Sequence, residues 1–261
     1  MKYKLAEDAR PQIKFLLIAT VITIALWFIP YADYLVYPIR LFVTFVHEGS
    51  HVLAALLTGG TVESLSVASN GSGEVYSVPS GFFGAVLTSS AGYLGSTAFG
   101  VLLLVLIRRA ISARIVLTGS AIFVGAMTVF FGLLAPFWNL LPPNTTIGGI
   151  AFTVISGTIL TIGLLAIARY ARPKAAQFVV SFLAVQCILN ALSDLKTVFF
   201  LSSPFANPMQ TDAANMANAT GLPAIVWVFV WIGISVLMIS VGLRVYAVSQ
   251  KKANHDLPFA D

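Results

Sequence analysis

The chain alternates long apolar segments with short polar connections. Each segment is long enough to cross a bilayer as a helix, which takes roughly 20 mostly apolar residues. The segments are residues 14–30, 35–57, 82–107, 115–141, 151–168, 176–201 and 223–246. The pattern predicts an all-α polytopic membrane protein, a bundle of about six to seven transmembrane helices.

The composition supports this class. Hydrophobic residues make up 58% of the chain and charged residues 10%, which is typical of a membrane protein and not of a soluble domain. The short connections leave no room for a second domain, so we expect residues 1–261 to form one integral-membrane domain with polar tails at 1–13 and 247–261. We expect it to be a multi-pass protein of the cell (plasma) membrane.

The charges and the single cysteine exclude several kinds of partner and site. The net charge of +5 comes from lysines and arginines at the segment ends, where they meet lipid headgroups, so it indicates no nucleic-acid partner. Seven full crossings would place the N-terminus outside, whereas its lysines favour the inside. We therefore expect one segment in the first third not to cross completely. One cysteine, Cys187, excludes an internal disulfide and a multi-cysteine metal site.

Residues 58–80 interrupt the helical pattern. Residues 61–67 and 74–78 alternate as strands do, and Asn70-Gly71 between them supplies turn chemistry. This predicts a short β-hairpin with an Asn-Gly turn. Sheet edges are excluded from lipid unless protein or a watery cavity covers them, so such a hairpin would lie at the interface or line a cavity. An ordinary loop outside the membrane is the alternative.

Two histidines inside the second apolar segment form a candidate metal site. The motif is His47-Glu48-Gly49-Ser50-His51. Positions i and i+4 share one helix face, so both imidazoles can reach one metal ion. Glu48 is placed to act as a general base on water at the metal. Burying these residues without partners would cost several kcal/mol, which favours a functional role over a merely hydrogen-bonded structural one.

A hydrolytic zinc site usually has three protein ligands and leaves one position open. Apart from Glu48, Asp194 is the acidic residue that falls within an apolar segment; Asp212 lies in a connection between two segments. We therefore expect Asp194 to be the third ligand, with Asn190, four residues earlier, orienting the substrate or the ligands. Pairing of Asp194 with Lys196, or exposure at a helix end, is the alternative.

Arg40 lies two helical turns before His47 on roughly the same face. It would counter a carboxylate, bind a substrate C-terminus, or extend to the membrane interface.

At these residues the chain resembles the site-2-protease class of intramembrane metalloproteases, in particular its small peptidase M50B-like branch. The resemblance rests on four stretches: residues 47–60, Asn70-Gly71-Ser72-Gly73, Ala91-Gly92-Tyr93-Leu94-Gly95, and Asn190 with Asp194. It implies a zinc ion held by His47, His51 and a distal aspartate, with Glu48 as general base. It also implies that the hairpin holds a substrate strand by edge pairing.

The chain departs from the larger members of that class in two ways. They carry the third ligand in an Asn-Pro…Leu-Asp-Gly element, which is missing here. Asn139, in Asn139-Leu140-Leu141-Pro142-Pro143, echoes the start of that element without its aspartate and competes with Asn190 for the substrate-orienting role. No PDZ-like domain is present, so the bundle itself or a partner would select substrates.

We therefore expect an intramembrane zinc-dependent endopeptidase that hydrolyses peptide bonds of membrane proteins or peptides in the lipid bilayer. The alternative is a non-proteolytic zinc-binding membrane protein, such as a carrier or a regulatory pseudo-protease. Such a protein would keep the ligands and have no use for Glu48 as a base.

Overall fold

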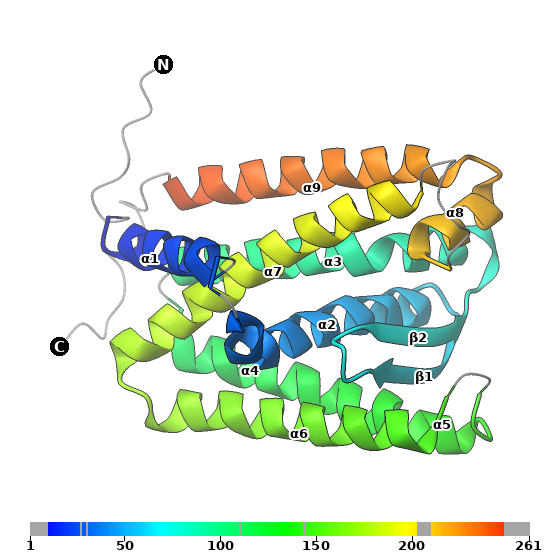
Figure 1. Ribbon diagram of the computed structural model, residues 1–261, viewed down its shortest axis with the longest axis horizontal. Coiled ribbons are helices and arrows are strands. Elements are labelled where there is room, and N and C mark those ends of the chain that lie inside the picture. The colour runs from blue at the N-terminus through cyan, green and yellow to red at the C-terminus, as the bar shows by residue number, and fades with distance from the viewer. Residues whose placement is uncertain are drawn as a thin grey trace, which may run out of the picture.

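The structure is a computed structural model in which long helices lie side by side and a small hairpin packs at one end (Figure 1). It describes residues 10–26, 28–29, 31–109, 111–142, 145–202 and 210–247. Of the expected tails at 1–13 and 247–261, residues 1–9 and 248–261 lie outside the described residues, whereas residues 10–13 form the start of a helix.

The helices account for most of the described chain. In order they are α1 (Arg10–Leu26), α2 (Ala32–Leu57), α3 (Gly81–Arg108), α4 (Ala113–Ala126), the π-helical stretch η2 (Met127–Leu134), α5 (Ala135–Trp138), α6 (Ile147–Tyr170), α7 (Pro173–Leu201), α8 (Asp212–Thr220) and α9 (Ala224–Ala247). Together with the hairpin they confirm the expected helical membrane-protein fold.

Five of the described helical segments are long and apolar enough to cross a membrane: α3, α6, α7, α9 and the continuous segment Ala113–Trp138. These five indicate a multi-pass membrane protein. The expected segments 14–30 and 35–57 are not among them. The apolar part of the first is short, Ile13–Leu26, and α2 carries Arg40 and the His-Glu motif, which lower its hydropathy.

The hairpin follows α2 directly, as predicted. Strand β1 (Thr61–Val67) pairs antiparallel with β2 (Gly73–Val78), and the register shifts between Val62 and Ser64. The turn contains Asn70, whose side chain accepts a hydrogen bond from the Ser72 amide at 2.9 Å. Gly71 follows in the left-handed region, with φ of 83°, which glycine adopts without strain.

Helices cover the β1 side of the hairpin. β1 packs against η2, α5 and α6, and the Val67 amide donates a hydrogen bond to the Thr153 hydroxyl of α6 at 2.8 Å. In the part of the chain that the structure describes, β2 pairs with β1 and with no other strand.

α3 packs against helices from both ends of the sequence. It contacts α2, which precedes it, and α7, α8 and α9 from the C-terminal part of the chain. The hairpin and α8 lie at the same end of the molecule, on the right in Figure 1, beside the C-terminal half of α2. This end therefore brings together the metal motif, the hairpin and a connection that is distant in sequence.

Candidate metal centre

The two histidines of α2 face the same point, as their helical spacing predicts. Their ring centroids are 4.9 Å apart. Nδ1 of His51 lies 2.7 Å from the carbonyl oxygen of Thr88 on α3. Since that oxygen can only accept a hydrogen bond, Nδ1 donates to it, and Nε2 is the ring nitrogen that faces Asp212.

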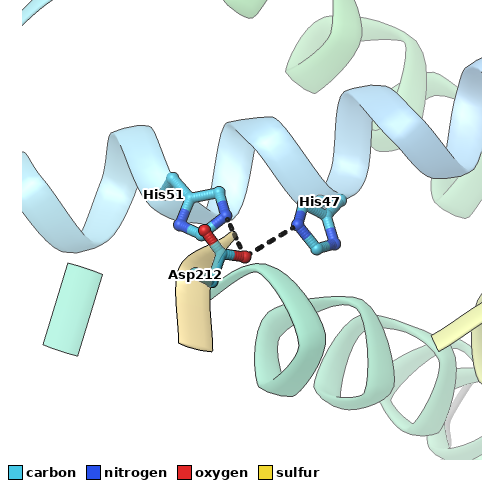
Figure 2. Close-up of side chains that lie close together, drawn as sticks. All are labelled: His47, His51 and Asp212. Carbon is cyan, nitrogen blue, oxygen red and sulfur yellow. Dashed lines mark ion pairs between the residues drawn. The ribbon is translucent and has the colours of Figure 1, made fainter. Parts of the chain in front are cut away.

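The carboxylate that joins the histidines belongs to Asp212, at the start of α8. Its Oδ2 lies 3.4 Å from Nε2 of His47 and 3.3 Å from Nε2 of His51 (Figure 2). The ligand atoms of these three residues all lie within 4.8 Å of one another. Burial acts to raise the pKa of the Asp212 carboxyl, but the charge of His51 and hydrogen bonds to both imidazoles hold that pKa below its usual range.

Local sequence explains why Asp212 reaches this point. The hydroxyl of Thr211 caps α8 by accepting a hydrogen bond from the Ala214 amide at 3.2 Å, which starts the helix at Asp212. At the other end, the indole N–H of Trp227 on α9 donates to the Thr220 hydroxyl at 2.9 Å. Both ends of this short helix are thus fixed.

The backbone of α3 forms the floor of the centre at Gly92. A Cβ at this position would overlap Nε2 of His47 and Nε2 of His51, so a side chain here would fill the space between the ligand atoms. Two imidazoles and one carboxylate are a donor set that hydrolytic zinc sites use. The residues present therefore fit a zinc ion.

Glu48 is buried next to the centre. Its carboxylate lies against Gly73, the first residue of β2, where an added Cβ would be 2.5 Å from Oε1. The hairpin turn is itself held to α2, because the Thr44 hydroxyl donates to the Gly71 carbonyl at 2.7 Å and the Tyr37 hydroxyl donates to the Ser69 carbonyl at 2.6 Å.

Two cavities open on the centre. The larger, about 730 Å³, lies between β2, the start of α3 and α8, and contains Asp212, Asn215 and Asn218 in its wall. The smaller, about 300 Å³, lies between α2, the hairpin turn and α7. Both have His47, Glu48, Gly73 and Tyr93 in their walls.

Asp194, Asn190 and Arg40 line the smaller cavity together with His47 and Glu48. Asn190 donates to the carbonyl of Gln186 at 2.9 Å and to its side-chain oxygen at 3.1 Å. The structure thus brings these three sequence-predicted residues to the site, but it groups Asp212, and not Asp194, with the histidines.

Asn139 lies elsewhere. It follows α5 and donates to the carbonyls of Ala135 at 2.9 Å and Glu63 at 3.3 Å, so it contacts β1 at the register shift. It is in the wall of neither cavity described above, and its substrate-orienting role stays a prediction.

Sequence reasoning overlooked Asp212, and it quoted Gly92 and Tyr93 without giving them a role. One signal was present for Asp212. Asp212, Asn215 and Asn218 recur every third residue in a short polar stretch between two apolar segments, which is the pattern of a helix with one polar face.

Comparison with known proteins gives a family for the chain. Searches of curated proteins and of solved structures found no match. Among protein families, Peptidase M50B-like matches residues 17–242, a stretch that includes the metal motif, the hairpin, α7 and α8. This confirms the resemblance drawn from the motifs. The chain therefore belongs to the Peptidase M50B-like family, a family of metallopeptidases.

Proposed function

We propose that the protein is an intramembrane zinc-dependent endopeptidase of the cell membrane that cleaves membrane-protein or peptide substrates. One observation carries the proposal: two imidazoles of α2 and a carboxylate of α8 converge on one point, with the buried Glu48 beside it. Membership in a membrane peptidase family implies peptide substrates.

The third ligand in this proposal is Asp212. Its Oδ2 is about equally far from both imidazole nitrogens, as a ligand of a shared ion would be. Asp194, the ligand expected from the sequence, lines the smaller cavity beside His47 and remains the competing assignment. In our proposal Asp194, Asn190 and Arg40 contact the substrate in that cavity.

Glu48 is proposed as the general base. A bound zinc ion would supply Lewis-acid activation of water and of the peptide carbonyl. Glu48 would take a proton from the attacking water and return it to the leaving amine. Gly73 would hold the Glu48 carboxylate in place, because its backbone lies directly against it.

The edge of β2 that faces away from β1 is proposed to bind the substrate. Residues Gly73 to Ser77 of this strand line the larger cavity in succession, and Asp212 lines the same cavity. A transmembrane substrate helix has to unwind before cleavage, because its amides are occupied by its own hydrogen bonds. An unwound segment can pair with an exposed strand edge.

The test combines metal analysis with turnover. We expect about one zinc ion per molecule in detergent-purified protein, and loss of zinc in His47→Ala and His51→Ala. Glu48→Gln should keep zinc and lose cleavage of a fluorescein-labelled casein reporter, by at least about 10²-fold. Retained cleavage in Glu48→Gln would disprove the proposed base. Zinc without any cleavage by the parent protein would favour a non-proteolytic zinc-binding protein.

A further inference from the structure

The two cavities meet at four residues. His47, Glu48, Gly73 and Tyr93 are in the walls of both. A peptide that occupied both cavities would lie along these four residues, and the bond to be cleaved would then lie beside them. His47 would hold the metal there, Glu48 would be the base, and Gly73 is backbone. Tyr93 has no role in the function proposed so far.

Tyr93 is held rigidly at this junction by contacts on both sides of its ring. The ring packs edge-on against His47, with centroids 4.9 Å apart and an interplanar angle of 78°. On another side it contacts Trp231 of α9, with centroids 5.3 Å apart. The Trp231 indole in turn donates a hydrogen bond to the Ser90 hydroxyl at 3.0 Å. A side chain fixed in this way loses little freedom when it binds a reacting group.

The hydroxyl of Tyr93 points toward the metal centre. It interacts with the carboxylate of Asp212, and the residue is 5% exposed. The Tyr93 hydroxyl is therefore within reach of a group placed between His47 and Asp212. Of the four junction residues, Tyr93 alone has a hydroxyl.

The chemistry of peptide hydrolysis calls for such a donor. When water adds to the peptide carbonyl, the carbonyl oxygen gains negative charge, and fixed hydrogen-bond donors aimed at that oxygen lower the barrier. We propose that Tyr93 is a catalytic residue whose hydroxyl donates a hydrogen bond to the carbonyl oxygen of the scissile peptide bond. This inference rests on the proposed endopeptidase function.

The step needs no further reactant. The oxygen of water bonds to the carbonyl carbon, and the carbon–nitrogen bond then breaks. The proton that Glu48 removes from water goes to the leaving amine. Tyr93 keeps its proton throughout, and its hydrogen bond strengthens as the carbonyl oxygen becomes negative.

The experiment is Tyr93→Phe, which removes the hydroxyl and keeps the ring packed against His47 and Trp231. With zinc at a saturating concentration, so that the variant is fully loaded, we expect kcat for labelled casein to fall on the order of 10²-fold, with KM unchanged. A binding measurement distinguishes a catalytic role of the Tyr93 hydroxyl from a structural role. Labelled casein should bind Glu48→Gln and the Glu48→Gln/Tyr93→Phe double variant with the same Kd.

Tyr246→Phe is the matched control, because Tyr246 is a buried tyrosine of α9 that lines neither cavity. It should keep parental kcat. Parental kcat in Tyr93→Phe would overturn the inference while leaving the endopeptidase intact. Failure of Tyr93→Phe to bind zinc, or a weaker Kd in the double variant, would also overturn it, because Tyr93 would then be structural or a binding residue. Absence of cleavage by the parent protein would instead refute the proposed function.

Discussion

Two aspartates lie near the histidine pair, Asp194 and Asp212, and they belong to very different helices. Asp194 lies within the long apolar helix α7 and lines the smaller cavity with Arg40. Asp212 begins the short polar helix α8 and contacts both imidazoles. The carboxylate in the more apolar sequence is thus the one farther from the metal group. A charged residue inside an apolar segment indicates a functional role. It does not show whether that role is to bind the metal or to contact the substrate.

Removing each carboxylate in turn tests which of the two binds the metal. We expect Asp212→Ala to weaken zinc binding by more than the 10- to 100-fold typical of a residue that only supports a ligand. Asp194→Ala should change zinc affinity by less than about 10-fold. Competition with a chelator measures both. The reverse order, with zinc lost in Asp194→Ala and kept in Asp212→Ala, would make Asp194 the third ligand.

Two glycines separate metal binding from turnover. Gly92→Ala should abolish zinc binding, because its methyl group would overlap both imidazole nitrogens. Gly73→Ala should keep zinc and lower casein cleavage on the order of 10²-fold, because its methyl group would displace the Glu48 carboxylate. Gly163→Ala on α6, where an added Cβ meets nothing within 4 Å, is the control for both. Equal zinc loss in Gly92→Ala and Gly73→Ala would contradict this division.

The pH dependence of zinc binding tests whether histidines are ligands of the metal. The neighbouring imidazoles hold the pKa of Asp212 below its usual range, so this carboxyl stays ionised as the pH falls from 8 to 5. Protons compete with zinc for the imidazole nitrogens, because a histidine has to be neutral to bind the metal. We expect the zinc content to fall steadily as the pH is lowered from 8, measured by elemental analysis after equilibration. Zinc that stays bound below about pH 4.5 would argue against histidine ligands.

The smallest effect is expected from a change in the smaller cavity, where Asn190 lies beside Asp194. Asn190→Ala should raise KM for labelled casein about 2- to 10-fold, the value of one hydrogen bond, with zinc content and kcat unchanged. Steady-state kinetics and metal analysis on the same preparation give all three quantities. A loss of zinc in this variant would show that Asn190 supports the ligands and does not contact the substrate.

Features that depend on near neighbours in the chain can be predicted from the sequence. The spacing of His47 and His51 places both on one helix face, and Asn70-Gly71 marks the turn between two alternating strands. The apolar segments that form α3, α6, α7 and α9 are long enough to be recognised without any tertiary contact. Each of these features is fixed by local geometry or by hydropathy summed over one segment.

Tertiary structure alone decided which distant residues complete the site. Asp212 follows His51 by more than 150 residues, and it reaches the centre because α8 packs against α3. The position of Tyr93 between His47 and Trp231 depends in the same way on three helices meeting. The spacing of Asp212, Asn215 and Asn218 indicates a helix with one polar face, but it does not show what that face contacts. Burial and hydrogen bonding reward many alternative packings of apolar helices nearly equally.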